Sequence, residues 1–265
     1  MITLSIVIPV FNEEKRLYKT FEALESLILF RGLKLESVIF VNDGSTDKTL
    51  NILKSYTSKN KSIPITISTY KTNKGKGYAV KIGMLKSPSI YTLLCDADMS
   101  TPFSELRKFE REITENIPII IGTRKNGKST VIVHQPKIRE LLGKGFTRLT
   151  QFLLRLEVSD FTCGFKLFSK EAIPQIFTNT SVNRWGYDAE ILYIAKKKSL
   201  MVKEKPVQWS NGKGSHVNVY IAIPQTFFEM GKIVTIHSIL PQLIRLNTLS
   251  ANSYVKVSQF LTAHH

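Results

Sequence analysis

The amino-acid sequence predicts an α/β protein in which a mostly parallel central sheet is flanked by helices on both faces. In the first half, short apolar runs alternate with longer segments of helical periodicity. The short runs are almost continuously apolar, as in strands that are covered on both sides. This repeated order of strand and helix favours β-α-β units, which place successive strands parallel to one another.

Five apolar runs have the length and composition of buried strands. They occupy residues 4–10, 37–41, 64–69, 90–95 and 117–121. The segments between them carry apolar residues every three or four positions, which is typical of helices with one buried face. We therefore predict helices at residues 14–30, 48–56, 77–85 and 103–113.

After residue 123 the composition changes, and Lys and Arg become frequent. Residues 139–156 combine Leu and Phe at helical spacing with basic residues, which predicts an amphipathic helix, and residues 217–246 form a second amphipathic stretch. No linker rich in Pro, Gly or Ser interrupts the chain. We predict a single domain at residues 1–245, followed by a C-terminal tail at 246–265. The domain has two halves, residues 1–123 and 124–245.

The composition excludes several classes of protein. Hydrophobic residues make up 43% of the 265 residues, which is enough for a sizeable core and excludes a disordered chain. Cys95 and Cys163 are the only cysteines, so a disulfide scaffold is excluded, and no Cys/His spacing indicates a zinc site. The formal net charge of +16 predicts an anionic partner: nucleic acid, an acidic membrane surface or a phosphorylated substrate. No apolar run suits a secretory signal or a membrane-spanning helix, so we expect a cytoplasmic location.

Four polar motifs follow apolar runs. Ligands of parallel α/β sheets bind outside the carboxyl ends of the strands, so these motifs are expected to meet at one edge. They are Ile-Pro-Val-Phe-Asn-Glu-Glu at 8–14, Val-Asn-Asp-Gly-Ser-Thr-Asp at 41–47, Asn-Lys-Gly-Lys-Gly at 73–77 and Asp-Ala-Asp at 96–98.

Asp96 and Asp98 flank one small residue at the end of a predicted strand. Two such carboxylates can hold a hard cation, Mg²⁺ or Mn²⁺, whose other ligands are water and phosphate oxygens. The alternative is a pair of acidic turn residues, with Ser100 or Thr101 capping the next helix. The three other polar strand ends favour the metal site.

Asp43 and the glycine-containing motif at 73–77 are individually less specific. Asp43 could accept the imide hydrogen of a uracil, or it could belong to a turn that precedes a helix. The motif at 73–77 has neither the Walker spacing nor the dinucleotide Gly-x-Gly-x-x-Gly pattern. It indicates close approach of the backbone to a ligand, with Lys74 and Lys76 available for phosphate charge.

Taken together, the four motifs resemble those of the family 2 glycosyltransferases, which have the Rossmann-like GT-A fold. Three further segments are similar to the dolichyl-phosphate β-glucosyltransferase branch: Asp-Phe-Thr-Cys-Gly-Phe-Lys-Leu-Phe at 160–168, Arg-Trp-Gly-Tyr-Asp-Ala-Glu-Ile-Leu at 184–192, and Pro-Val-Gln-Trp at 206–209 followed by Gly214-Ser215. The resemblance spans residues 3–245. This chain departs from the branch at His216, where a lysine is common.

The resemblance implies an inverting transfer of a sugar, with UDP-glucose as the favoured donor, to a polyprenyl or dolichyl phosphate. Residues 1–123 would bind the nucleotide sugar and residues 124–245 would face the acceptor. Asp98 would ligate Mg²⁺ or Mn²⁺ on the diphosphate, and Asp96 would lie near the ribose and the metal. The residues implied in nucleotide-sugar binding are Pro9, Asn12, Glu13, Asp43, Lys74, Gly75, Asp96 and Asp98.

The implied acceptor makes a chemical prediction of its own. A phosphate monoester is largely ionised near neutral pH, so it needs cations that position it rather than a strong base. Arg binds phosphate oxygens in bidentate fashion, although a single Arg is more often a solvated surface charge. We assign the acceptor phosphate to Arg124, Arg139, Lys166 and Ser215, and give catalytic roles to Asp98, Asp188 and Arg139.

Asp188 and Glu190 would share a face on a strand but not on a helix. We expect Asp188 to orient Arg184, a cation or the sugar hydroxyls, unless it is only a carboxylate at a helix start. Glu190 and Trp185 are assigned to contact with the sugar or the acceptor, the alternative for Trp185 being core packing.

The two amphipathic stretches predict peripheral association with an anionic membrane surface on its cytoplasmic face. The alternative is that they pack on the core or form an oligomer contact, and the oligomeric state stays open. Two other functions remain: a family 2 enzyme that uses GDP-mannose or a glycan hydroxyl acceptor, and a basic nucleic-acid-binding protein. Nucleic acid is not expected, because four acidic strand ends would repel its backbone and no nucleic-acid-binding signature occurs.

Overall fold

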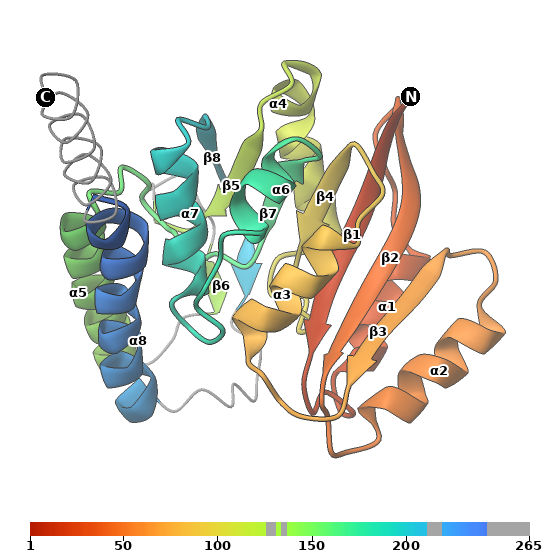
Figure 1. Cartoon of the computed structure of the whole chain (residues 1–265). Coiled ribbons are helices and arrows are strands. Elements are labelled where there is room, and N and C mark those ends of the chain that lie inside the picture. The colour runs from red at the N-terminus through yellow and green to blue at the C-terminus, as the bar shows by residue number, and fades with distance from the viewer. Residues whose placement is uncertain (126–130, 134–136, 211–218, 243–265) are drawn as a thin grey trace, which may run out of the picture.

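The computed structural model describes residues 1–125, 131–133, 137–210 and 219–242, the side chains of 131–144, 146 and 219–224 excepted. Its centre is a seven-stranded sheet in the order β3-β2-β1-β4-β7-β5-β8 (Figure 1). The strands are β1 Ile2–Val10, β2 Leu33–Asp43, β3 Ile65–Tyr70, β4 Tyr91–Leu94, β5 Ile119–Thr123, β7 Lys166–Ser169 and β8 Val202–Pro206. A separate small sheet pairs β6 Val131–Val133 with β9 Trp209–Ser210.

The sheet is parallel except at β7, which lies between β4 and β5 and runs antiparallel to both. The five predicted strands are therefore confirmed, and so is the mostly parallel sheet. The strands of the second half, β7 and β8, were not predicted. β7 has four residues and β8 contains the charged residues Lys203, Glu204 and Lys205, so neither stands out as an apolar run.

The helices lie on both faces of this sheet, as expected. They are α1 Leu17–Glu25, α2 Thr49–Lys59, α3 Lys76–Leu85, the 3₁₀ helix η1 Phe103–Phe109, α4 Glu110–Thr114, α5 Lys137–Leu154, α6 Ala172–Phe177, α7 Tyr187–Lys197, α8 Val219–Val234 and the π-helical turn η2 Thr235–Ile239. The predicted helix 14–30 is shorter at both ends. It begins only at Leu17, after a segment in which the backbone amides of Glu13 and Glu14 donate to Thr49 and Asp47 at the start of α2. The predicted helix 103–113 is divided into η1 and α4.

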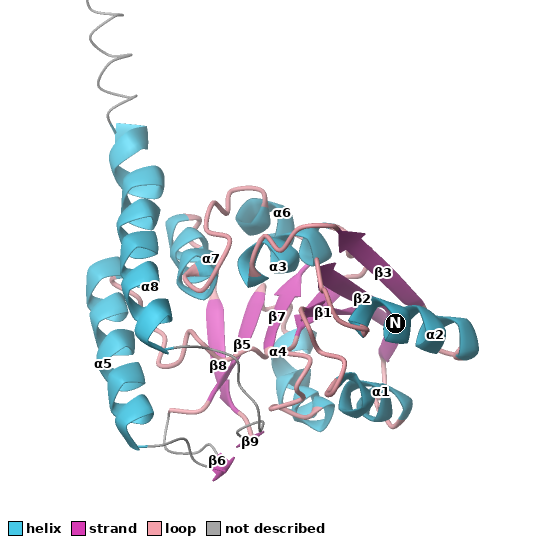
Figure 2. Ribbon diagram, turned by 90° about the horizontal axis from the view of Figure 1, so that it is seen from below, coloured by secondary structure: helices cyan, strands magenta, loops and turns pink. Residues whose placement is uncertain are grey.

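Two hydrophobic cores, one on each face, hold the layers together. Along β1, Ile6 and Ile8 belong to one core and Val7 to the other, because successive side chains of a strand point to opposite faces. Helices α1, η1 and α4 cover the first core, and α3, α6 and α7 cover the second (Figure 2). Fully covered strands of this kind explain the continuous apolar runs in the sequence.

Helices α5 and α8 lie side by side at the end of the sheet formed by β8, far from β3 (Figures 1 and 2). Large apolar side chains remain exposed on this pair: Leu149, Phe152 and Leu153 on α5, and Phe227 and Phe228 on α8. Within the described part of the chain, no helix has both the length and the apolar character needed to span a bilayer.

Candidate functional site

The loops after β1 and β2 are fastened to each other by hydrogen bonds. The Asn12 amide donates to Ser45 Oγ at 3.0 Å, and the Thr46 amide donates to Asn12 Oδ1 at 2.9 Å. Asn12 adopts a left-handed backbone conformation with φ of 54°, which asparagine tolerates better than most residues. Pro9 and Glu13 flank this turn, so three of the predicted nucleotide-binding residues lie in one fixed segment at the carboxyl edge of the sheet.

Asp43 lies at the end of β2 and anchors the glycine-containing loop before α3. Its side chain is buried, and its two oxygens accept hydrogen bonds from the Lys74 amide at 2.7 Å, the Gly75 amide at 2.9 Å and Asn73 Nδ2 at 2.9 Å. The same loop meets residues 181–187 on its other side. A Cβ at Gly75, which has φ of 102°, would collide with the Asn183 carbonyl oxygen.

Asp96 is paired with a lysine of that loop. Lys76 Nζ lies 2.6 Å from Asp96 Oδ1, and both side chains are partly exposed. Burial acts to raise the pKa of Asp96, but the charge and hydrogen bond of Lys76, followed by the charges of Lys166 and Arg124, lower it overall. The carboxylate also rests against Gly164, where any Cβ would collide with Asp96 Oδ2.

Asp98 is the less engaged carboxylate of the pair. Its Oδ1 accepts a hydrogen bond from the Ser100 amide at 3.0 Å, and the side chain is partly exposed. No group of three or more His, Cys, Asp or Glu side chains forms a cage for a metal among the described residues. The two carboxylates of Asp96 and Asp98 fit Mg²⁺ or Mn²⁺, because these ions are commonly held by one or two carboxylates together with phosphate oxygens.

Lys166 and Asp188 form an ion pair beneath the same edge. The Lys166 side chain is fully buried, and its ammonium donates to Asp188 Oδ1 and to the Cys163 carbonyl oxygen at 2.6 Å. Asp188 stands in the first turn of α7. Its partner Lys166 is a cation, and orienting a cation is one of the options predicted for Asp188. The prediction that Lys166 binds the acceptor phosphate needs correction, because this ammonium is enclosed and already paired.

Glu190 also points away from the carboxyl edge, as its spacing from Asp188 on a helix requires. It is fully buried and accepts hydrogen bonds from Ser181, from the Val182 amide and from His237. Burial raises its pKa, but the hydrogen bonds from His237 and Ser181 outweigh this effect and lower it. The predicted contact of Glu190 with sugar or acceptor is therefore corrected to a structural role. Trp185, by contrast, is 41% exposed, so its alternative assignment to the core is wrong.

Arg124 makes a bidentate ion pair with Asp160. Its Nε and Nη2 donate to the two carboxylate oxygens at 2.7 and 2.9 Å, and the guanidinium lies over the Trp209 ring at 5.2 Å. Two of the guanidinium nitrogens with which Arg124 was expected to bind an acceptor phosphate therefore already donate to Asp160. The other two predicted phosphate ligands, the Arg139 side chain and Ser215, lie outside the described residues.

Several contributors to the site were missed in the sequence. The sequence indicates only a phosphate charge for Lys76, whereas the structure pairs this lysine directly with Asp96. Gly164 and Asp160 lie in a motif that was noted for its resemblance, but nothing in its spacing indicates which side chain each one meets. Glu229 of α8 accepts the Gly186 amide at 2.7 Å and was not singled out at all.

A seven-stranded, mostly parallel sheet with Asp-Ala-Asp after β4 and polar loops along its carboxyl edge is the GT-A type of α/β fold. Residues 5–177 match the family described as Glycosyl transferase family 2. The chain is a member of this family, and the resemblance noted in its sequence is confirmed.

Individual relatives agree with this membership. The chain is 34% identical over 231 residues to a dolichyl-phosphate beta-glucosyltransferase of Dictyostelium discoideum, covering 83% of this chain and 70% of that protein. It is 33% identical over 239 residues to the human dolichyl-phosphate beta-glucosyltransferase, covering 86% and 72%. Among solved structures, glucosyl-3-phosphoglycerate synthase of Mycobacterium tuberculosis, in complex with Mn²⁺, UDP-glucose and phosphoglyceric acid, has a TM-score of 0.62 at 13% identity, covering 89% of this chain and 80% of the other.

Proposed function

We propose that this chain transfers a sugar, most favourably glucose from UDP-glucose, to a polyprenyl or dolichyl phosphate at a membrane surface. The observation that carries the proposal is the carboxyl edge itself, where the partly exposed Asp98 lies beside the Lys76–Asp96 pair. The names of the relatives from Dictyostelium and human support glucose as the sugar and a lipid phosphate as the acceptor.

The donor would occupy the loops after β1, β2 and β3. Pro9, Asn12 and Glu13 would contact the nucleoside, and Asp43 would act through the loop that it anchors. Lys74 and Lys76 lie at the start of α3, where their positive charge and the helix dipole favour a diphosphate. Asp98, with Asp96, would hold Mg²⁺ or Mn²⁺, which supplies Lewis-acid stabilisation of the charge on the leaving nucleoside diphosphate.

The acceptor chemistry fits a site without a free general base. An acceptor phosphate oxygen forms the new bond to the anomeric carbon while the bond from that carbon to the donor phosphate breaks, so the configuration inverts. A phosphate monoester is largely dianionic near neutral pH and has no proton to lose in this step. The enclosed pairing of Asp188 with Lys166 is consistent with a carboxylate that positions neighbouring groups rather than one that removes a proton.

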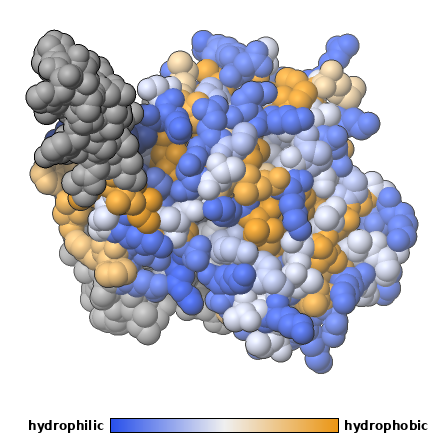
Figure 3. Space-filling view, in the orientation of Figure 1, coloured by the Kyte–Doolittle hydropathy of each residue, from blue (hydrophilic) through white to orange (hydrophobic). Residues whose placement is uncertain are grey.

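The exposed apolar side chains of α5 and α8 support contact with the membrane. Phe152 is 79% exposed and Phe228 is 81% exposed, and two basic residues are exposed nearby, Arg148 on α5 and Arg155 directly after its end. An apolar area is visible over this pair of helices at the left of Figure 3. Aromatic side chains next to basic ones suit the boundary between anionic headgroups and acyl chains. We propose peripheral binding there, on the cytoplasmic face.

A donor screen with a short polyprenyl phosphate and Mn²⁺ or Mg²⁺ tests the proposal, with the lipid product detected by mass spectrometry. We expect lipid-linked hexose from UDP-glucose, and its loss with EDTA. Product from GDP-mannose alone would change the donor. Transfer to a saccharide but not to polyprenyl phosphate would reject the lipid acceptor and favour a glycan hydroxyl acceptor.

A further inference from the structure

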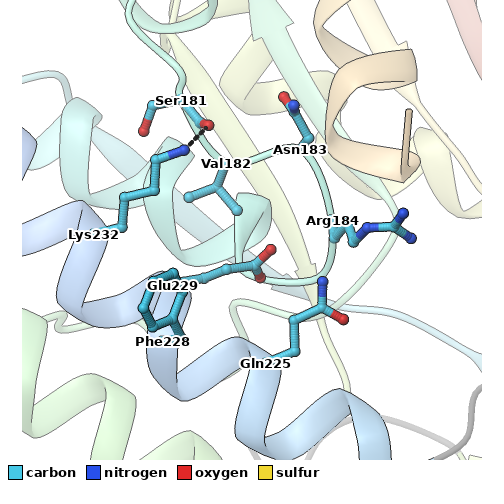
Figure 4. A pocket seen from close by; sticks show the side chains of 8 residues that line it. All are labelled: Ser181, Val182, Asn183, Arg184, Gln225, Phe228, Glu229 and Lys232. Carbon is cyan, nitrogen blue, oxygen red and sulfur yellow. Dashed lines mark hydrogen bonds between the residues drawn. The ribbon is translucent and has the colours of Figure 1, made fainter.

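A hollow of about 250 Å³ lies between residues 181–184 and α8, outside the four strand-end motifs (Figure 4). Its wall contains charged, amide and aromatic groups from two segments that are far apart in the sequence. The groups that matter here are Asn183, Arg184, Gln225, Phe228, Glu229 and Lys232.

The two cations of this hollow differ in what they already bind. Lys232 Nζ donates to the Ser181 carbonyl oxygen at 2.8 Å and closes one end. Arg184 lies with Gln225 at the other end, and its side chain points away from Lys232 (Figure 4). The side chain is exposed, and no hydrogen bond joins its guanidinium to another residue in the described part of the chain. Glu229 lies between the two ends, where its carboxylate accepts the Gly186 amide. The end at Arg184 is therefore the one that can take an additional anion.

Arg184 also lies against the proposed donor site. Its Cγ would be 2.8 Å from a Cβ added at Gly75, and the preceding Asn183 carbonyl accepts the Tyr78 amide at 3.2 Å. The loop that carries Arg184 is thus packed on the loop that precedes α3. An anion held by Arg184 would lie beside the donor, as an acceptor phosphate must.

The opposite wall of the hollow joins the exposed apolar face of α8. Phe228 lines the hollow and is 81% exposed, and Phe227 next to it is 45% exposed. A ligand with an anionic head and an apolar chain could therefore place its head at Arg184 and lead its chain past Phe228 to the surface of α8. Both ends of such a ligand would meet groups of suitable chemistry.

We propose that this hollow is the acceptor subsite, in which Arg184 and Gln225 bind the phosphate of an isoprenoid phosphate and Phe228 contacts its first apolar units. The inference rests on the proposed function, since it gives that reaction its acceptor residues. It also gives Arg124 and Lys166, which are paired internally, no direct part in holding the phosphate.

The test compares the full-length chain with Arg184→Gln, Arg184→Lys and Lys198→Gln. Lys198 is exposed at the end of α7 and serves as a control for the loss of one positive charge. We expect Arg184→Gln to raise the KM for polyprenyl phosphate about tenfold or more, since a charge-assisted hydrogen bond is lost. Arg184→Lys should recover part of this loss, and Lys198→Gln should change nothing. The Kd for UDP-glucose, measured by calorimetry, should stay within about twofold in all three.

A binding measurement separates this inference from the proposed function. Farnesyl phosphate, farnesol and inorganic phosphate are titrated into the wild type and Arg184→Gln. Binding of farnesyl phosphate that depends on Arg184 supports the subsite even if the wild type transfers no sugar to a lipid. Transfer by the wild type with an unchanged acceptor KM in Arg184→Gln would overturn the subsite and leave the function standing. If Arg184→Gln weakens binding to phosphatidylglycerol vesicles but not to farnesyl phosphate, the hollow holds bilayer headgroups and the acceptor assignment is overturned.

Discussion

Lys166 and Asp188 lie 22 residues apart in the chain and form an ion pair in which the lysine side chain is completely buried. Lys166 begins β7, the antiparallel strand, and Asp188 stands in the first turn of α7. The pair therefore joins the sheet to the helix layer directly beneath the carboxyl edge. The Cys163 carbonyl accepts a second hydrogen bond from the same ammonium, so this charge is well satisfied.

Removing one partner of this pair should be costly. Asp188→Asn leaves a buried ammonium without its counter-ion, and we expect a loss of about 3–5 kcal/mol in the free energy of unfolding, measured by urea denaturation. The double variant Lys166→Met with Asp188→Leu should be less destabilised than Asp188→Asn, because no charge remains buried. Equal stability of Asp188→Asn and wild type would contradict the pairing.

Asp98→Asn should separate activity from stability. Asp98 is partly exposed and accepts one backbone hydrogen bond, so we expect only a small change in Tm. Turnover should fall about 100-fold or more, because a lost cation contact costs several kcal/mol in the transition state. Mn²⁺ binding in the presence of UDP, followed by electron paramagnetic resonance, should weaken in parallel. Near-normal turnover would reject Asp98 as a metal ligand.

The Arg124–Asp160 pair predicts a dependence of stability on acidity. Burial raises the pKa of Asp160, but the hydrogen bond and charge of Arg124 dominate and hold it far below its ordinary value. A carboxyl whose pKa is lower in the folded state stabilises the fold at pH values above its unfolded pKa of about 3.9, and this contribution declines as the pH falls further. Urea unfolding between pH 3 and 7 should show wild type about 3 kcal/mol more stable than Asp160→Asn at pH 7. This difference in the free energy of unfolding should shrink below about pH 4. A difference that stays constant with pH would contradict the lowered pKa of Asp160 in the folded state.

Gly164→Ala should disturb Asp96 without opening the core. The added Cβ would collide with the Asp96 carboxylate and push it away from Lys76. We expect donor affinity to fall about tenfold, roughly the worth of one charge-assisted hydrogen bond, as measured by calorimetry with UDP-glucose and Mn²⁺. The matched control is Gly145→Ala on α5, where an added Cβ meets nothing within 4 Å. It should leave affinity unchanged and stabilise the helix by up to about 1 kcal/mol.

Phe152→Gln should weaken membrane association while sparing the fold. The ring is 79% exposed on α5, so its removal should not change Tm appreciably. Inserting a phenyl ring is worth about 1–2 kcal/mol, so binding to vesicles containing phosphatidylglycerol should fall roughly 5- to 30-fold in flotation assays. Tyr18→Gln on α1 replaces another exposed aromatic residue, which is 54% exposed, and should have no effect. Equal losses in the two variants would argue against a specific membrane face at α5.

The arrangement of the carboxyl edge was largely predictable from the sequence, but the pairing of its charges was not. Parallel strands end on the same side, so a polar motif after each apolar run was sufficient to bring Asn12, Asp43 and Asp98 to one edge. Periodicity says nothing about which amides a carboxylate will accept. Asp43 is therefore found holding the loop before α3, an arrangement that depends on tertiary packing.

The second half was less predictable for a related reason. β7 is too short to show a strand pattern, and its antiparallel insertion determines where Lys166 points. The direction of the Glu190 side chain can be derived once α7 is known, because Glu190 and Asp188 are two residues apart and such residues on a helix face different directions. The bonds of Glu190 to His237 and Ser181 link segments that no local pattern connects.

The position of β7 between β4 and β5 places a strand of the second half of the chain inside the sheet begun by the first half. A fragment ending at residue 123 would contain β4 and β5 but not the strand that joins them. It would present the sheet β3-β2-β1-β4 with an unpaired edge at β4, and β5 as a strand without a partner. Completing the sheet requires contacts between residues such as Leu93 and Leu167, which are distant in the sequence, and such closures are slow. Until residues 166–169 have been synthesised and inserted, we expect the edge of β4 to stay unpaired, and unpaired edges of this kind favour aggregation.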